Sequence, residues 1–238
     1  MKFLLNIFSL FLVFNSYAQL DPLNTAKNCS YMTAEEKEMI REINLLRSDP
    51  KGYARLIEPR LDAAKAVLKQ NGKGAPNYSL TTTYVNGVGK PGRIDTTWHF
   101  QNEEEVKALS TLMDELKKLK PLSILKPDSG IYLAAKKHAL DNHKHEWKLG
   151  HFGSDNSAPW ERIMKFSPIM KFGNENIAMS SANPTPRDIV LQLLIDSGIP
   201  GYGHRENLLD PNWTHVACTG ENYQSMYHWW LQEFGVIK

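Results

Sequence analysis

The sequence predicts an α+β domain, in which amphipathic helices precede a C-terminal pair of antiparallel strands. Helix-capping residues stand in front of apolar stripes, and two strand-like segments, 213–219 and 226–234, flank a turn at 220–225. The chain of 238 residues is 42% hydrophobic and 23% charged, an ordinary balance for a globular protein. A chain of this length can bury a core without disulfides or bound metals.

The first helix is predicted at residues 33–46, where Thr33 and Glu36 have the spacing of a capping box. An apolar stripe follows, made of Met39, Ile40, Ile43 and Leu46. A second helix is predicted from Pro50 to a turn at 71–72. Both helices therefore have a defined beginning and an apolar side that can face a core.

Residues 73–101 change in character, because they are rich in Gly, Thr, Tyr and Asn and suggest two β-like runs around 86–87 and 91–92. A charged amphipathic helix is predicted at 102–120. This part is too short to bury a core of its own. The expected organisation is a signal peptide at 1–18, an N-terminal arm at 19–32 and a single domain at 33–238 with an insertion at about 73–120.

Three further helices are predicted in the second half of the chain. They cover 129–147, 159–166, and a segment that begins at Pro184 or Thr185 and runs through Asp196. Glycine and proline residues just after Asp196 stop the last of them.

The segment MKFLLNIFSLFLVFNSYAQL at the beginning of the chain has the parts of a secretory signal peptide. Lys2 supplies a positive charge, residues 3–14 form an apolar run, and Ser16-Tyr17-Ala18 is a small-x-small ending. The run is shorter than the ~20 residues that span a bilayer; an N-terminal core helix is the alternative. We therefore expect a secreted protein, extracellular or periplasmic, without a transmembrane segment.

Cys29 and Cys218 are the two cysteines of the chain. Export permits a disulfide between them, which would join the N-terminal arm to the core. Two separate buried thiols are the alternative.

Three stretches of the C-terminal half carry polar residues that could perform chemistry. LGHFGSDNSAPWERI contains His151 and Glu161, FGNENIAM contains Glu175, and LLIDSGIPGYGHRENLL contains Asp196 and His204. Each polar group stands beside a glycine-containing turn and apolar residues, and a semi-buried carboxylate such as Glu175 needs a partner. The stretch HEWKLGH is not a zinc-protease motif, because its histidines have the wrong spacing and a glycine interrupts the helix.

The same stretches resemble the CAP superfamily, which contains cysteine-rich secretory proteins, antigen 5 and plant pathogenesis-related proteins; its bacterial SCP-like members are the most similar. The resembling segments, in the family's order, are INLLRSDPKGYARLI, LAAKKHALDN, GHFGSDNSAPWERI, GNENIA and DSGIPGYGHRENLLDPNWTHVACTG. They lie within about 33–57 and 121–234. One departure is Asn174, an extra residue between Gly173 and Glu175 in the motif Gly-Glu-Asn-Ile-Ala.

The resemblance implies an α/β/α sandwich, with a small and mainly antiparallel sheet between helical layers. It also implies a cleft that contains two histidines and two acidic residues. The matching positions are His151, Glu161, Glu175, Asp196 and His204. Glu175 is the first acid, whereas the second is either Asp196, where eukaryotic members have glutamate, or Glu161, the bacterial-type acidic position.

Two neutral imidazoles and a carboxylate that converge would suit a divalent metal, with zinc as the first choice. The implied ligands are His151, His204 and Glu175. The alternative is a hydrogen-bonded histidine–glutamate pair that only orders loops. We expect the turn at 201–203 to bring His204 toward the cleft as a loop residue, and His138 to be an ordinary helix residue at the cleft wall.

The resemblance implies a secreted binding module for a small hydrophobic ligand, such as a lipid, or for a peptide. The second hypothesis is a metal-assisted hydrolase with Glu175 or Glu161 as its base, and the third is a structural protein with a vestigial cleft. No Ser-His or Cys-His pair is visible by motif, so the sequence favours a binding protein over an enzyme. The formal net charge of +2 gives no reason to expect nucleic acid as a partner, and we expect a monomer.

The mature chain is expected to begin at Gln19, because Ala18 is the last small residue before polar sequence. N-terminal sequencing of the exported protein checks this. An exported chain that still carries residues 1–18 would contradict the prediction.

Overall fold

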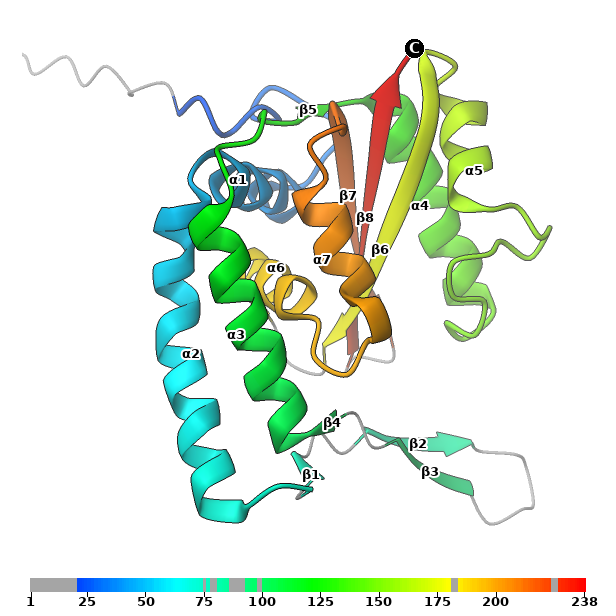
Figure 1. Ribbon diagram of the computed structural model, residues 1–238. Helices are drawn as coiled ribbons and strands as arrows, with labels where there is room; N and C mark the ends of the chain where they lie inside the picture. The colour runs from blue at the N-terminus through cyan, green and yellow to red at the C-terminus, as the bar shows by residue number, and fades with distance from the viewer. Residues whose placement is uncertain are drawn as a thin grey trace, which may run out of the picture.

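The structure, a computed structural model, is an α/β/α sandwich in which helices cover both faces of one sheet (Figure 1). It describes residues 21–74, 76–77, 81–85, 93–97, 100–180, 184–223 and 227–238. The predicted α+β class is confirmed. The predicted signal peptide at 1–18 and its cleavage point lie outside the described residues. Within the described ranges, no helix has the length and apolar character needed to cross a membrane.

The helices α1 (Ala34–Ser48) and α2 (Pro50–Asn71) begin where the sequence predicts. The Thr33 hydroxyl accepts from the Glu36 N–H at 3.2 Å, and the Glu36 carboxylate accepts from the Thr33 N–H at 2.8 Å, which completes the capping box. The predicted apolar stripe of α1 is fully buried: Met39, Ile40, Ile43 and Leu46. Pro59 lies inside α2 without ending it.

The predicted insertion contains a hairpin and a helix. Its elements are β1 (Pro76–Asn77), β2 (Thr81–Val85), β3 (Arg93–Thr97), β4 (Phe100–Gln101) and α3 (Asn102–Lys118). β2 pairs antiparallel with β3, and Figure 1 shows this hairpin projecting from the body of the protein. α3 lies beside α2 and buries Leu109, Leu112 and Leu116 in the main core. The helix therefore belongs to the core, while the residues between β2 and β3 lie outside the described part.

One four-stranded sheet forms the middle layer, with the strand order β5–β7–β8–β6. Its strands are β5 (Lys126–Pro127), β6 (Met170–Ser180), β7 (His215–Tyr223) and β8 (Tyr227–Ile237). β5 runs parallel to β7, whereas β7 and β6 are antiparallel to β8. The sequence predicts the β7–β8 pair but not β6, which is the long edge strand that carries Glu175.

Different helices cover the two faces of this sheet. α4 (Ser129–Lys144) and α5 (Pro159–Phe166) lie on one face, and α1, α6 (Pro186–Ile195) and α7 (Gly203–Leu209) lie on the other (Figure 1). Gly235 of β8 leaves space for Ile131 of α4, while Gln232 points the opposite way and donates to the Met39 sulfur of α1 at 3.3 Å. The two helical layers therefore meet the sheet through alternating residues of β8.

Arg205 fixes α7 in place. Its guanidinium is buried and donates to the carbonyls of Leu194 and Ile195, at the end of α6, over 2.9 and 2.8 Å. It also donates to the Ala108 carbonyl of α3 at 2.9 Å. Because the last carbonyls of a helix have no partner within that helix, this residue pairs them and joins three helices. His204 is the second residue of α7, so the prediction that it lies in a loop was wrong.

Both cysteines are free thiols in the structure, so the predicted Cys29–Cys218 disulfide is not formed there. Cys218 is buried in β7, and burial raises the pKa of its thiol well above the usual value. A protonated thiol is a poor nucleophile. The Cys218 side chain therefore acts as a small apolar group of the core.

Replacing Arg205 by Met should lower the free energy of unfolding by roughly 3 kcal/mol, because buried carbonyls lose charged donors. The control is Arg60→Met on α2, whose half-exposed side chain lies 3.8 Å from Asp188. That change should cost less than about 0.5 kcal/mol. Urea denaturation measures both, and equal midpoints for the two variants would show that Arg205 does not hold α7.

Candidate functional site

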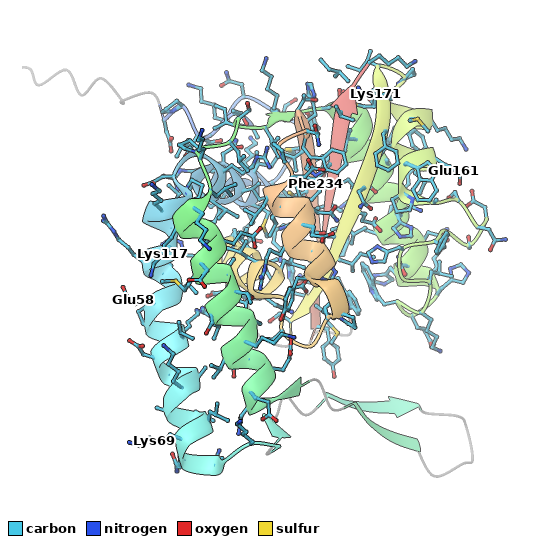
Figure 2. The ribbon with its side chains drawn as sticks, in the orientation of Figure 1. Glu58, Lys69, Lys117, Glu161, Lys171 and Phe234 are labelled. Atoms are coloured by element: carbon cyan, nitrogen blue, oxygen red, sulfur yellow. The ribbon has the colours of Figure 1, made fainter. Side chains whose placement is uncertain are left out.

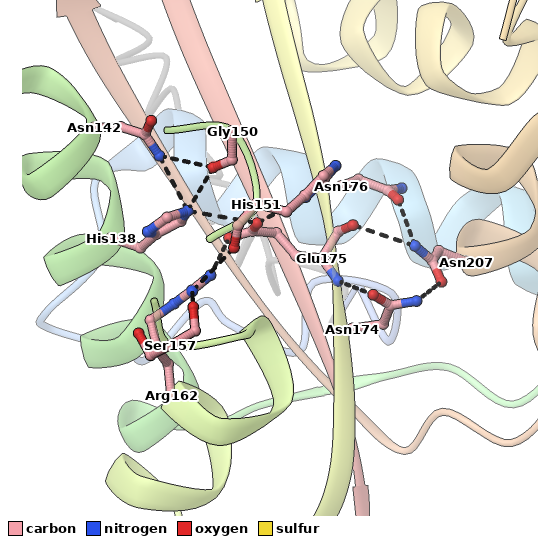
Figure 3. A network of polar contacts seen from close by, with 10 residues as sticks. All are labelled: His138, Asn142, Gly150, His151, Ser157, Arg162, Asn174, Glu175, Asn176 and Asn207. Atoms are coloured by element: carbon pink, nitrogen blue, oxygen red, sulfur yellow. Dashed lines mark hydrogen bonds and ion pairs between the residues drawn. The ribbon is translucent and has the colours of Figure 1, made fainter. Parts of the chain in front are cut away.

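Glu175 on β6 is the centre of a buried polar network (Figure 3). Its Oε1 atom lies 2.9 Å from His151 Nδ1, and its Oε2 atom accepts from Arg162 Nη2 at 3.2 Å. An ionised carboxylate only accepts hydrogen bonds, so His151 carries a hydrogen on Nδ1 in this contact. Glu175 is 2% exposed, whereas the His151 side chain is 46% exposed. The contact with the buried carboxylate therefore orients the half-exposed imidazole and leaves its Nε2 atom for a ligand.

Arg162 of α5 connects Glu175 to the loop that carries His151. Its Nη1 atom donates to the carbonyl oxygens of His151 and Ser157 at 3.0 and 2.7 Å. The guanidinium is buried, and it neutralises the buried carboxylate while fixing the loop backbone. The sequence analysis missed Arg162. Two signals in the sequence could have pointed to it. Arg162 directly follows Glu161, and a buried Glu175 needs a cation as a partner.

His138 of α4 forms the inner wall of the network. Its Nε2 atom lies 2.9 Å from the Gly150 carbonyl oxygen and 3.7 Å from Glu175 Oε1. Asn142 donates to the same Gly150 oxygen at 3.0 Å. Burial lowers the pKa of His138 below its usual value, although the nearby Glu175 acts in the opposite sense. The side chain predicted as an ordinary helix residue is therefore a direct neighbour of Glu175.

Glu233 of β8 is a second buried carboxyl group, directly opposite Glu175 in the strand register. The Glu175 N–H and C=O groups bond to the side chains of Asn174 and Asn207 instead of β8. Glu175 and Glu233 are therefore a non-hydrogen-bonded pair of the antiparallel ladder, in which the facing side chains come close. Burial raises the pKa of Glu233 well above its usual value; the charge of Glu175 raises it further and Arg162 opposes this. Glu233 therefore keeps its proton to a higher pH than an ordinary glutamate does.

Asp196 and His204 form a separate pair where α6 meets α7. Asp196 ends α6 in the left-handed conformation, with φ of 57°, and Gly198 and Gly201 also have positive φ. These residues turn the chain back, so that His204 Nδ1 lies 2.7 Å from Asp196 Oδ1. The His204 N–H donates to Asp196 Oδ2 at 2.9 Å. A buried carboxylate again orients an imidazole through Nδ1.

Asparagine side chains connect β6 to α7 (Figure 3). Asn176 donates to the His204 carbonyl at 3.1 Å, and Asn207 donates to Asn176 Oδ1 at 2.7 Å. Because Glu175 and Asn176 are consecutive strand residues, their side chains leave opposite faces of the sheet. Asn174, the departure from the family motif, accepts from the Glu175 N–H at 2.9 Å. The extra asparagine therefore pairs a backbone group on the open edge of the sheet.

The structure brings the predicted cleft residues together as pairs. His151 contacts Glu175 from one side of β6, and His204 contacts Asp196 on the other. Glu161 joins neither pair, because its carboxylate accepts from the backbone at the start of its own helix at 2.8 Å. Of the two candidates for the second acid of the cleft, Asp196 therefore contacts a histidine, whereas Glu161 caps α5.

The predicted zinc site consists of His151, His204 and Glu175. Across the described ranges, no group of three or more His, Cys, Asp and Glu side chains is arranged to hold a metal ion. Each of the two imidazoles already uses Nδ1 for its own carboxylate. This contact leaves Nε2 of each imidazole for a metal, but both oxygens of Glu175 are engaged by His151 and Arg162, so the carboxylate does not complete a three-ligand centre as it stands. The zinc site stays a prediction, and no functional step below depends on it.

A cavity of about 410 Å³ lies beside the network, between α4 and α5. This volume is typical of small-molecule sites, which span roughly 300–1,000 Å³. Its apolar lining includes Leu140 and Phe166, and its polar lining includes His138, Arg162 and Glu161. The cavity and the Glu175 network therefore share two buried side chains.

Comparison with known families gives one match that spans most of the chain. The model described as "CAP: Cysteine-rich secretory protein family" matches residues 70–234. This range contains the His151, Glu175, Asp196 and His204 positions.

The chain is also similar to individual proteins. It is 28% identical over 132 residues to the uncharacterized protein YkwD of Bacillus subtilis (strain 168), which is 56% of this chain and 46% of that protein. The chain thus spans about half the length of this curated relative. An outer surface protein from Borrelia burgdorferi superposes with a TM-score of 0.42 at 20% identity, over 57% of this chain and 95% of that one. An extracellular SCP-domain protein from Bacillus anthracis str. Ames gives a TM-score of 0.37 at 20% identity, over 57% and 41%.

Glu233→Gln should change how stability depends on pH. The folded-state pKa of Glu233 is raised, so its contribution to stability is complete below about 4.5 and is lost as pH rises through the folded pKa. Each pH unit in that window costs the wild type up to about 1.4 kcal/mol, whereas glutamine has no charge to bury. The gap between variant and wild type in free energy of unfolding should therefore widen in favour of the variant from pH 4 to pH 8.

Urea denaturation at several pH values between 4 and 8 measures this gap. Glu161→Gln, which changes an exposed capping carboxylate, is the control and should show no such widening. Parallel pH profiles for wild type and Glu233→Gln would contradict a raised pKa of Glu233.

Proposed function

The chain belongs to the CAP family of cysteine-rich secretory proteins, and from this premise we propose that it is a secreted binding module. The proposal depends on one observation above all. His151 is a half-exposed imidazole whose ring is held by a buried and charge-balanced network of Glu175 and Arg162. A side chain fixed in this way loses little conformational entropy when it binds a ligand.

The hydrogen on Nδ1 defines what His151 can recognise. With Nδ1–H donated to Glu175, the neutral ring presents the lone pair of Nε2 and accepts a hydrogen bond. Its neighbour Phe152 is 55% exposed and offers apolar contact. A ligand with an O–H or N–H group beside an apolar part would contact both His151 Nε2 and the Phe152 ring. A small hydrophobic molecule or a peptide has this chemistry.

A metal-assisted or general-base hydrolase is the second candidate. The observation that favours it is the 2.7 Å contact between His204 Nδ1 and Asp196 Oδ1. A carboxylate that holds an imidazole in this tautomer leaves Nε2 as a proton acceptor, as in hydrolases that use histidine as a base. If the wild type hydrolyses a substrate and His204→Ala does not, the result would support the hydrolase function instead of the binding module.

The test measures binding of three probes that each carry an O–H or N–H donor beside an apolar part, by calorimetric titration: 1-decanol, cholesterol and an octapeptide library. At least one probe should bind the wild type, and His151→Ala should weaken that binding by roughly tenfold through loss of the hydrogen bond. His143→Ala, which changes an exposed histidine of α4, is the matched control and should bind like the wild type.

Two further arms separate the alternatives. Addition of EDTA should leave binding unchanged, and addition of zinc tests the predicted metal site directly. Product analysis after incubation should find each probe intact. If no probe binds, or if His151→Ala binds as well as the wild type, His151 is not part of a binding site.

A further inference from the structure

The cavity between α4 and α5 is lined by charged side chains of both signs. Arg162 is one of them, and it is paired with the buried Glu175. The others are three lysines and three carboxylates: Lys137, Lys144, Lys165, Asp141, Asp155 and Glu161. Among the described residues, no carboxylate lies within 4.0 Å of any of these lysines. Opposite charges therefore share a space of about 410 Å³ without forming ion pairs across it.

The two helical walls present their charges in opposite order along the chain. On α4, Lys137 precedes Asp141 by one turn, and on α5, Glu161 precedes Lys165 by one turn. Four residues of an α-helix rise about 6 Å along its axis. Lys144 lies beyond Asp141 in the last turn of α4. Each wall thus separates a lysine from a carboxylate by the same distance along its helix.

The lysines of the two walls lie at the same end of the cavity, because α4 and α5 run antiparallel. The beginning of α4 meets the end of α5, where the backbone of Gly130 packs directly against the Phe166 carbonyl oxygen. The Lys137 and Lys165 ammonium groups lie 5.0 and 5.9 Å from the centre of the Phe166 ring. An aromatic ring attracts cations, so Phe166 holds both lysines at this basic end.

The loop before α5 closes the other end, which is acidic. Both oxygens of Asp141 accept hydrogen bonds from this loop at 2.8 Å. Hydrogen bonds from Ser157 and, less strongly, the charge of Lys165 lower the pKa of Asp155, so this exposed carboxylate is ionised at neutral pH. Glu161 uses Oε2 for a backbone N–H at 2.8 Å. Its Oε1 atom is left for a ligand.

We propose that this cavity binds a short zwitterionic peptide, with a free dipeptide as the best fit. The α-carboxylate of the peptide lies beside Lys137 and Lys165 in this arrangement, and its α-ammonium group lies beside Glu161 and Asp155. An extended dipeptide spans about 7 Å, close to the rise of about 6 Å between the two charges of each wall. The length of the ligand thus matches the separation of the basic and acidic ends.

A ligand with both charges fits this cavity better than a ligand with one. An anion would pair with the lysines but face the carboxylates, and a cation would do the reverse. Apolar side chains of the peptide would contact Phe166 and Leu140, whose side chain is 48% exposed. The lining, as far as the structure describes it, does not include His151 or Phe152. The site is therefore separate from that of the proposed function.

The experiment titrates the protein with four forms of leucyl-phenylalanine: free, N-acetylated, C-amidated and blocked at both ends. At a pH of about 6.5 the free form carries both charges, because an α-amino group has a pKa of about 8 and an α-carboxyl group one of about 3.5. NMR titration measures each affinity and shows which amide signals move. The free form should bind most tightly and shift signals of α4 and α5, and each single block should weaken binding by roughly fivefold.

Variants of the lining assign each end of the peptide to one end of the cavity. Lys137→Gln should weaken the free and N-acetylated forms by roughly fivefold, and should leave the C-amidated form unchanged because it has no carboxylate. Glu161→Gln keeps an acceptor for the start of α5. It should weaken the free and C-amidated forms but not the N-acetylated form. Leu140→Ala should weaken all four forms, by roughly threefold.

Three control variants should bind the free dipeptide like the wild type. Lys171→Gln changes an exposed lysine, labelled in Figure 2 near the start of β6, that is not in the lining. Leu133→Ala changes a side chain of α4 that is 48% exposed, as Leu140 is. His151→Ala changes the site of the proposed function.

The proposal is overturned if no form binds, or if a form with one blocked end binds as tightly as the free dipeptide. Equal binding by the wild type, Lys137→Gln and Glu161→Gln would overturn it as well. If His151→Ala alone abolishes binding, the dipeptide belongs to the site of the proposed function and not to this cavity. Failure of the His151 tests with decanol and cholesterol leaves the predictions for the cavity unchanged.

Discussion

The buried ion pair between Arg162 and Glu175 is the interaction on which the His151 region depends. A carboxylate inside the sandwich needs a cation and further hydrogen bonds, and Arg162 supplies the charge while His151 supplies a donor. The same guanidinium holds two loop carbonyls, so loss of Arg162 would release the loop backbone as well as leave the Glu175 carboxylate without its cation. Burial and the charge of Glu175 raise the pKa of the neighbouring Glu233 well above its usual value.

Strand β6 divides the candidate site into two parts. Alternation along the strand sends Glu175 toward α4 and α5 and sends Asn176 toward α7. Each part has one imidazole bonded to its own carboxylate, and their shared element is the strand backbone. A ligand that contacts both histidines would have to pass over the edge of the sheet at β6.

Local patterns in the sequence predicted the helices α1 to α6, because a capping box such as that of Thr33 and Glu36 acts over a few residues; they did not predict α7. They did not predict β6, because its buried positions carry Glu and Asn, and the partners that allow this come from α5 and α7. The family resemblance identified His151, Glu175 and His204. It did not identify Arg162 or Glu233, since the packing of α5 brings Arg162 to Glu175 and the strand register brings Glu233 opposite it.

The outer edge of β6 has a consequence for the behaviour of the protein in solution. An unpaired edge strand is a template on which another chain can add a strand and begin to aggregate. Here the amides of Asn174 and Asn207 occupy the N–H and C=O of Glu175, and Gln192 donates to the Met179 carbonyl at 3.3 Å. An intruding strand would have to displace these side chains one by one, so the edge is protected against amyloid-like extension without a covering helix.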